Sequence, residues 1–310
     1  MSETDNLMDF RRNFYEKFHK VLIPAVAKFE SERKTKLFWA IFWTIILIAA
    51  GIAYFYFITA YKIEGRRKEE PGLYLIVGGL GTYYTFKKNF ESKIKQRIMG
   101  VVSSCFGNMQ WSQLYSLEDA KQFTRAGLFA DITRTAIDDA FYGTYKGVAI
   151  DIVEGKFING SGRNSSISFQ GLLIKLKMNK NFKGHTILME DTLLHHTPVK
   201  SLKHTELEDI KFEKRYDVFT DDEVEARYIL TPTLMEKLAG VRMAFLCSKI
   251  RCAFYEGELL IAMVPTKDLF SLGSLVKPVT DTKQFERLCN QFISVLSLID
   301  YLKLDSQAVL

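Results

Sequence analysis

Cysteine, histidine and proline are scarce in this chain, with four, five and six copies in 310 residues. The cysteines contain no C-x-x-C pair, so neither a disulfide framework nor a cysteine metal site is indicated, and we expect reduced, mostly buried thiols. The adjacent His195 and His196 would point to opposite faces of a strand, and no H-x-x-x-H spacing occurs. The sequence therefore predicts no metal site and no cofactor.

Charged residues are absent from two long stretches. Leu37–Tyr61 and Pro71–Phe86 contain no Asp, Glu, Lys, Arg or His. As a helix, the first stretch would be about 37 Å long, enough to cross the roughly 30 Å hydrocarbon core of a bilayer, and the second would be about 24 Å long. Because neither stretch carries an acidic, basic or histidine side chain, transport by these two helices alone is excluded.

The distribution of basic residues favours two membrane crossings. Ten lie just outside the two stretches and four between them, namely Lys20, Lys28, Arg33, Lys34, Lys36, Lys87, Lys88, Lys93, Lys95 and Arg97 outside, and Lys62, Arg66, Arg67 and Lys68 between. By the positive-inside rule, this asymmetry predicts a transmembrane hairpin in the inner membrane with both termini cytoplasmic. Small residues would let the two helices approach closely. They are Ala49, Ala50, Ala53, Gly78, Gly79 and Gly81.

Amphipathic patterns flank the hairpin on both sides. Phe10, Phe14, Phe18 and Leu22 recur every four residues, which predicts a helix that lies either on the membrane surface or against the folded domain. After the second stretch, apolar residues at helical spacing predict that the helix continues as a stalk.

The positive charge belongs to the membrane-proximal part of the chain. Residues 1–104 carry a net charge of +7 and residues 105–310 carry −1, which together give the overall +6. The basic part would meet anionic lipid headgroups. The remainder has no electrostatic footprint for nucleic acid, so we expect membrane lipids as partners and no nucleic acid.

Beyond the stalk, the patterning predicts strands and a few capped helices. Ser116 and Gly127 bracket a helix at Leu117–Arg125. Lys146–Gly147 and Glu256–Gly257 indicate hairpin turns. Thr220 with Glu223 forms a capping box that predicts a helix over Asp221–Ile229, and Thr231 followed by Pro232 predicts another helix start. Apolar residues from Phe285 to Leu302 recur at helical spacing.

These patterns predict an α+β chain with four parts. An amphipathic N-terminal helical region (1–36) precedes a two-helix transmembrane hairpin (37–86, with spans 37–61 and 71–86). A helical stalk (87–110) then leads to a cytoplasmic α+β domain (111–310) of antiparallel strands with segregated helices and a long C-terminal helix.

Six segments of the chain form a recognisable set of motifs: Phe212–Phe219, Val224–Pro232, Met235–Leu238, Tyr142–Val148, Phe169–Leu173 and Pro24–Arg33. Together they resemble the domain-of-unknown-function 3137 family of bacterial membrane proteins. The resemblance covers nearly the whole chain and implies a two-helix anchor with a cytoplasmic domain. It implies no established activity, substrate or catalytic residue.

Two functions fit the sequence. The first is a membrane-anchored interaction or scaffolding module that binds a protein partner, because no catalytic constellation is present. The alternative is a membrane-tethered enzyme with an acidic and arginine-containing site near residues 206–228, whose carboxylates would have to converge in a pocket. Five residues mark the candidate interaction site or structural brace: Arg215, Tyr216, Glu225, Arg227 and Tyr228. A paired or buried Glu225 and Arg227 would indicate a brace, and an open cleft would indicate a site.

Overall fold

The computed structural model describes residues 3–62, 69–106, 108–177, 183–190, 199–206, 215–267, 269–270, 274–278 and 283–307. The chain forms two compact units. The helical unit comprises Glu16–Val102 with Ser271–Phe285, and the sheet unit comprises Met1–Tyr15, Ser103–Phe270 and Glu286–Leu310.

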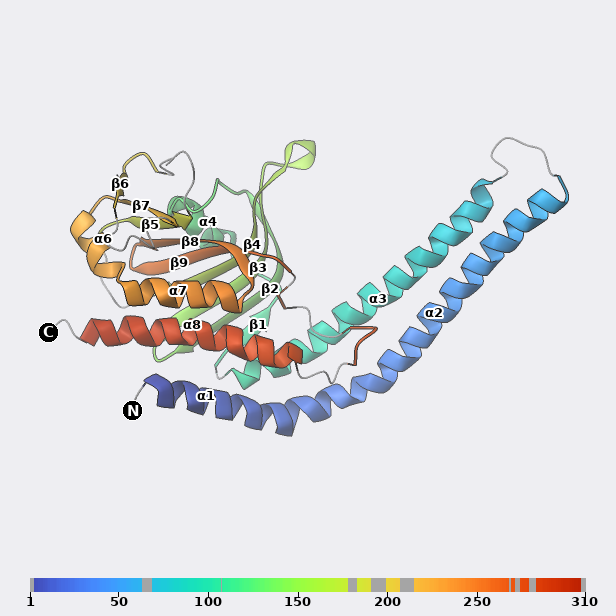
Figure 1. Cartoon of the computed structure of the whole chain (residues 1–310), viewed down its shortest axis with the longest axis horizontal. Helices are drawn as coiled ribbons and strands as arrows, with labels where there is room; N and C mark the ends of the chain where they lie inside the picture. Colours follow the sequence, from blue (N-terminus) through green and yellow to red (C-terminus); the bar gives the residue numbers. More distant parts are fainter. Residues whose placement is uncertain are drawn as a thin grey trace. The chain divides into compact units, whose positions relative to one another are not determined.

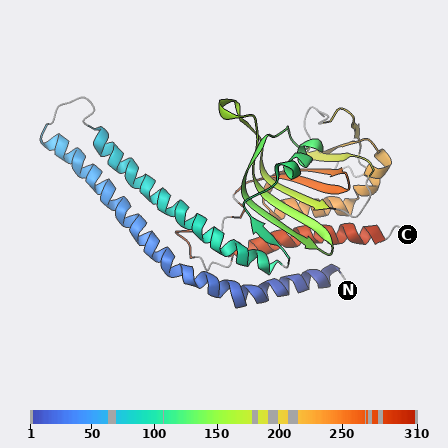
Figure 2. The same ribbon diagram turned by 180° about the vertical axis from the view of Figure 1, so that it is seen from behind.

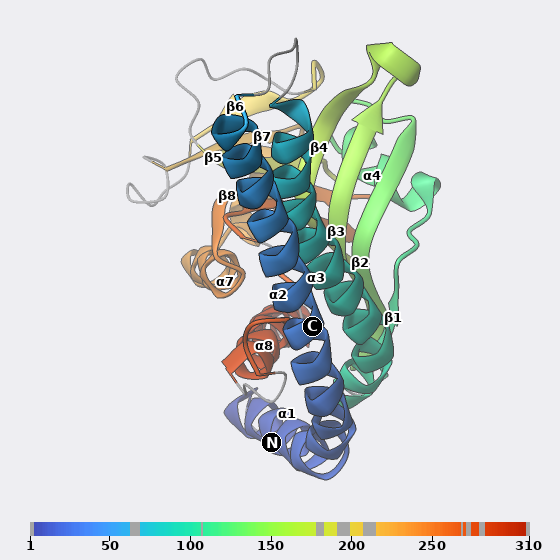
Figure 3. The same cartoon turned by 90° about the vertical axis from the view of Figure 1, so that its right-hand side faces the viewer.

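Two long helices build the helical unit. A π-helical turn, η1 (Phe18–Leu22), joins α1 (Glu3–Lys17) to α2 (Ile23–Ala60), and α3 (Glu70–Cys105) follows. Pro24 has no N–H for the carbonyl four residues earlier, which explains the irregular turn at this point. Figures 1 and 3 show α2 and α3 running side by side in opposite directions.

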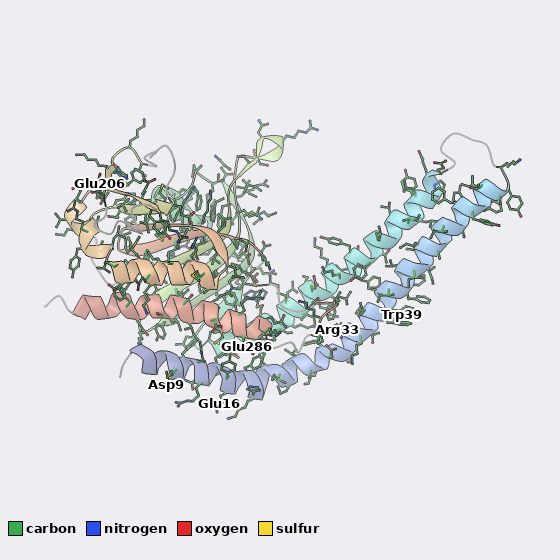
Figure 4. The ribbon with its side chains drawn as sticks, viewed as in Figure 1. Asp9, Glu16, Arg33, Trp39, Glu206 and Glu286 are labelled. Carbon is green, nitrogen blue, oxygen red and sulfur yellow. The ribbon has the colours of Figure 1, made fainter. Side chains whose placement is uncertain are left out.

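A buried arginine fastens residues 274–278 to α2. The Arg33 side chain, labelled in Figure 4, forms a bidentate pair with Glu30, with a distance of 2.6 Å from Nη2 to Oε1 and 3.0 Å from Nε to Oε2. Its Nη1 donates to the backbone carbonyls of Leu275 at 2.9 Å and Val276 at 3.3 Å. Arg33 is only 6 % exposed, so the guanidinium supplies the hydrogen bonds that water would otherwise give these groups.

The sheet unit is a nine-stranded antiparallel sheet in the order β1-β2-β3-β4-β9-β8-β5-β7-β6. The strands are β1 (Gln110–Ser112), β2 (Arg134–Tyr145), β3 (Val148–Asn159), β4 (Ser166–Lys177), β5 (Thr186–Glu190), β6 (Lys203–Thr205), β7 (Tyr216–Thr220), β8 (Cys247–Tyr255) and β9 (Glu258–Pro265), with a short 3-10 turn, η2 (Gly162–Asn164), before β4. Lys146 and Glu256 adopt positive φ before Gly147 and Gly257, which confirms the two predicted hairpin turns.

Helices cover both faces of this sheet. Figures 1 and 2 show α4 (Leu117–Arg125) on one face, and α7 (Pro232–Ala244) and α8 (Lys283–Gln307) on the other. The short α6 (Glu223–Ile229) precedes α7. Ala140 packs in the core on the α4 side, whereas the ring of its neighbour Phe141 meets Phe292 of α8 at a centroid distance of 5.2 Å. The α+β prediction, with an antiparallel sheet and a long C-terminal helix, is confirmed.

The predicted helix caps at Ser116 and Thr231 are also present. Ser116 Oγ accepts from the backbone N–H groups of Glu118 and Asp119, and Thr231 Oγ1 accepts from Leu234 N–H at 3.2 Å. The apolar stripe of α8 is buried along its length, and all four cysteines are buried thiols. Burial raises the pKa of Cys247 and of Cys289 to about 12, so both stay protonated at neutral pH.

The N-terminal phenylalanine stripe packs inside the protein and not on a membrane surface. Phe14 is fully buried, and its ring stacks on Phe106 with the ring centroids 5.0 Å apart. Phe106 in turn stacks on Phe292 at 4.0 Å. Within the helical unit, Phe18 meets Phe285 at 5.3 Å. Of the two predicted arrangements of this stripe, packing against the folded chain is confirmed.

The helix after β7 begins two residues later than predicted. Asp222, and not Thr220, is the N-cap: its Oδ1 accepts from Glu225 N–H at 3.0 Å. Thr220 is the last residue of β7, where it pairs with Thr186 of β5 and shares a hydrogen bond of 2.9 Å between the two hydroxyls. Sheet pairing holds Thr220 in the strand, so the cap moves to a later side chain.

We predict that Arg33→Ala loosens residues 274–278. The substitution leaves two carbonyls and the Glu30 carboxylate without their donor, which should cost about 1–3 kcal/mol locally. Hydrogen exchange of the backbone N–H groups of Leu275, Val276 and Lys277 in detergent-solubilised full-length protein should then accelerate several-fold. Lys34→Ala, an exposed neighbour with the same change in charge, is the control. Equal exchange rates in the two variants would contradict the role given to Arg33.

Candidate functional site

The outer sides of α2 and α3 carry most of the large apolar side chains that are exposed in the described residues. On α2 these are Phe38, Trp39, Ile41, Phe42, Trp43, Ile45, Ile46, Ile52, Tyr56 and Phe57, and on α3 they are Leu73, Tyr74, Val77, Leu80 and Tyr84. We call this set the anchor surface; Figure 4 labels Trp39 within it. An apolar surface of this extent marks a contact with a membrane or another protein.

Glycines at two points bring α2 and α3 close together. A Cβ on Gly51 would lie 2.8 Å from the carbonyl oxygen of Gly72 and 2.7 Å from Ile76 Cγ1. A Cβ on Gly79 would lie 3.2 Å from the carbonyl oxygen of Thr44. The helix backbones therefore approach too closely at these points for a larger residue to fit without a shift.

The prediction that small residues of the two stretches form the surface on which the helices pack is largely wrong. Gly78 and Gly81 face open space, and the alanines Ala49, Ala50 and Ala53 are exposed. Only Gly79 of the predicted set lies in the contact. Successive residues turn by about 100° around a helix, so the alanines next to Gly51 point away from the side that meets α3.

The threonine hydroxyls of the two charge-free stretches are bonded within their own helices. Thr44, Thr59, Thr82 and Thr85 each donate to the carbonyl four residues earlier, at distances between 2.7 and 2.8 Å. These are all the threonines of the two charge-free stretches. Backbone and side-chain polar groups bonded within their own helix are what a hydrocarbon environment requires.

One helix in the described part of the chain is long and apolar enough to cross a membrane, over Met8–Ala60. The predicted second span, Pro71–Phe86, which is sixteen residues long and includes four glycines, is not among the candidates found. A single candidate membrane helix is therefore found, in place of the predicted hairpin of two spans.

Glu225, the central residue of the predicted brace, holds the chain before β5. Its Oε2 accepts from Gly184 N–H at 2.7 Å and its Oε1 from Lys183 N–H at 3.1 Å, while Asp221 Oδ1 accepts from His185 N–H at 2.7 Å. A Cβ on Gly184 would lie 2.6 Å from Glu225 Oε2, so glycine is needed for this contact. Glu225 is therefore paired with backbone donors, whereas Arg227, which the brace would pair or bury as well, is exposed, so the choice between brace and interaction site stays a prediction.

The other predicted residues do not converge on Glu225. Arg227 and Tyr228 are exposed on α6. Tyr216 is buried in β7, and the Arg215 guanidinium lies 5.7 Å from the centre of its ring. Burial raises the pKa of Tyr216 above its ordinary value. The five residues therefore lie on α6, at the start of β7 and in the turn before it.

The acidic residues near 206–228 serve local contacts where the structure describes them. Asp217 is buried with an oxygen 3.4 Å from His204 Nε2, Asp222 caps α6, and Glu206 is exposed. Glu208, Asp209 and Glu213 lie outside the described residues, as do His195 and His196. Among the residues described, no group of three or more His, Cys, Asp or Glu is placed to hold a metal ion.

A charged network between α4 and the sheet was missed by sequence analysis. Lys175 Nζ lies 2.7 Å from Asp119 Oδ1 and 3.2 Å from Asp151 Oδ2, and Tyr115 donates to Asp151 at 3.4 Å. Burial raises the pKa of Asp151 although Lys175 opposes this change. Lys175 lies on the side of β4 that faces α4, where it reaches Asp119 of that helix. No spacing in the sequence connects these residues.

We predict that Glu225→Ala loosens the chain at residues 183–190. Two backbone donors lose a carboxylate acceptor, which should lower local stability by about 1–2 kcal/mol. Hydrogen exchange of peptides covering this segment, measured on the full chain, should then accelerate about tenfold. Glu223 is an exposed acid in the first turn of the same helix, and Glu223→Ala should change this exchange rate by less than about twofold. Equal exchange in both variants would contradict the brace.

Comparison with known proteins gives one family and one solved structure. Residues 167–304 match the sequence model of the family described as "Protein of unknown function (DUF3137)". No curated protein matches the chain. The chain is similar to the crystal structure of the mycobacterial trehalose monomycolate transport factor A, TtfA, with 13 % identity and a TM-score of 0.37, over 66 % of this chain and 95 % of that one. The motifs at Phe212–Phe219 and Val224–Pro232 lie in the matched region, and over residues 167–304 the chain is similar to the DUF3137 family.

Proposed function

We propose that this protein is anchored in the bacterial inner membrane by α2 and α3, which cross it as a hairpin, with both termini and the folded domain in the cytoplasm. The domain would act as an interaction or scaffolding module for a protein partner. The main observation in support of this proposal is that the two charge-free stretches end at the same level along the paired helices α2 and α3.

The two stretches end at the same level of the helix pair. Gly51 packs against Gly72 and Ile76, and farther along the pair Lys36 and Phe86 line the same cavity. The first charge-free stretch begins at the residue after Lys36, and the second ends at Phe86. Basic residues follow on both helices beyond this level. Matched boundaries of this kind support a hairpin whose basic end faces the cytoplasm.

The apolar part of α3 is shorter than that of α2. Polar residues of α3 begin again at Glu70, beside Gly72, which packs on Tyr54 and Phe55 of α2. The paired apolar region is therefore about 24 Å long, and Lys87 and Lys88 can extend toward the headgroups to make up the difference. Trp39 and Trp43 near one end and Tyr56 and Tyr74 near the other resemble the aromatic belts of membrane helices.

The exposed side of α6 supports an interaction role for the folded domain. Val224 is 80 % exposed and Tyr228 is 51 % exposed, one helical turn apart, and the exposed Arg227 lies beside them. Tyrosine and arginine are enriched where proteins bind one another. Glu225 braces the same short helix from its inner side, so this face is held in a fixed position.

The topology can be tested with single cysteines, because the four native thiols are buried. In intact cells, a membrane-impermeant maleimide should label Lys62→Cys in the loop after α2. Lys88→Cys, beyond the second stretch, should be labelled only after the inner membrane is permeabilised. The protein should also remain in the membrane fraction after carbonate extraction.

Two results would contradict the proposal. Labelling of Lys88→Cys from outside would show that α3 does not cross the membrane. Release of the chain by carbonate would show that the anchor surface is covered by something other than the bilayer.

A further inference from the structure

We propose that a cavity between α2 and α3 binds the phosphate group of an anionic membrane phospholipid. The proposal rests on the membrane anchoring proposed above, because it concerns the basic end of the same helix pair. It adds a binding site with a defined ligand class to what would otherwise be a passive anchor.

The cavity has a volume of about 170 Å³ and lies entirely within the helical unit. Glu32 and Lys36 of α2 line it, together with Phe86, Asn89, Phe90 and Lys93 of α3. This space is several times what a single water molecule needs. Its wall combines two aromatic rings with cationic and amide groups, so it offers both an apolar and a polar side to one ligand.

The charges around the cavity favour an anion. Lys93 Nζ lies 3.1 Å from Glu32 Oε1, and Arg97 Nη1 lies 3.5 Å from Glu32 Oε2. Lys36 lines the same cavity, so one carboxylate and two lysines lie in the wall, and Arg97 adds a third positive charge through its pair with Glu32. Arg97 is held in place over the ring of Phe29, at 5.6 Å from the ring centre. One added phosphate diester would bring this group of charges closer to balance.

The position of the cavity selects a lipid as the source of that phosphate. Lys36 is the last charged residue before the apolar stretch of α2, and Phe86 is the last residue of the apolar stretch of α3. In the proposed hairpin this level is the cytoplasmic interface, where lipid phosphates lie and lysines extend toward them. Phe86 and Phe90 would contact the glycerol and the start of the acyl chains.

The same charges discriminate between lipid headgroups. Phosphatidylethanolamine carries an ammonium group that would lie near the like charges of Lys36 and Lys93, and the carboxylate in the wall, Glu32, is already paired with Lys93 and Arg97. Phosphatidylglycerol presents a phosphate and neutral hydroxyls, and the Asn89 amide can donate to either. We therefore expect selectivity for phosphatidylglycerol and not general lipid binding.

The test compares lipid binding by the full-length protein in detergent, using native mass spectrometry with phosphatidylglycerol and phosphatidylethanolamine. The unmodified protein should bind phosphatidylglycerol at least tenfold more tightly. The double variant Lys36→Gln/Lys93→Gln should lose that preference. Lys34→Gln/Lys88→Gln removes the same charge from exposed positions outside the cavity and should change the preference less than twofold.

A variant without a charge change distinguishes binding in the cavity from general electrostatic attraction. Asn89→Leu should weaken phosphatidylglycerol binding several-fold while the thermal unfolding midpoint stays near that of the unmodified protein. Glycerol 3-phosphate in millimolar excess should not displace the lipid, because it lacks the acyl chains. Displacement by it would overturn the assignment to a lipid and indicate a soluble phosphate ester.

If both double lysine variants lost the preference for phosphatidylglycerol equally, the assignment of the binding site to the cavity would be overturned, and only diffuse electrostatic attraction would be left. Absence of any headgroup preference in the unmodified protein would overturn it as well. Carbonate extraction of the same variants distinguishes these failures from failure of the anchor. A protein that stays in the membrane without headgroup preference retains the proposed function and loses only this site.

Discussion

The apolar surface of α2 and α3 is the constraint on which the rest of the account depends. Each square ångström of such surface left in water costs about 25 cal/mol, so side chains like Phe38 and Ile45, both about 60 % exposed, need an apolar cover. The close glycine contacts between the helices and the internally bonded threonines agree with a cover that offers no hydrogen bonds. In the proposed arrangement the bilayer is that cover.

Arg33 lies just before the apolar surface begins, and it connects the anchor to a distant part of the sequence. The chain passes between the helical and sheet units four times, and residues 271–285 belong to the helical unit although they join β9 to α8. The Arg33 guanidinium binds this connection through the backbone carbonyls of Leu275 and Val276. The contact therefore does not depend on the side chains of these two residues. A buried guanidinium suits this task because its donors reach two carbonyls and one carboxylate at once.

Local signals in the sequence predicted the elements whose geometry depends on local residues. The caps at Ser116 and Thr231 and the turn at Lys146–Gly147 formed where expected, because cap and turn chemistry acts within a few residues. Thr220 failed as a cap because pairing with Thr186, far away in the sequence, decided its conformation. Lys175, Asp119 and Asp151 come from three separate parts of the chain, so no local signal predicted their network. Glu225 binds Gly184, which lies 41 residues earlier in the sequence, so local residues did not reveal this contact either.

The most direct test of the central claim uses the tryptophans of the anchor surface. Trp39 and Trp43 are 43 % and 45 % exposed on α2. In vesicles with lipids brominated on their acyl chains, the fluorescence of the protein should be strongly quenched, and this quenching should disappear in the Trp39→Phe/Trp43→Phe variant, which keeps only Trp111. Quenching of Trp39 and Trp43 by aqueous iodide, with no response to brominated lipids, would contradict the account.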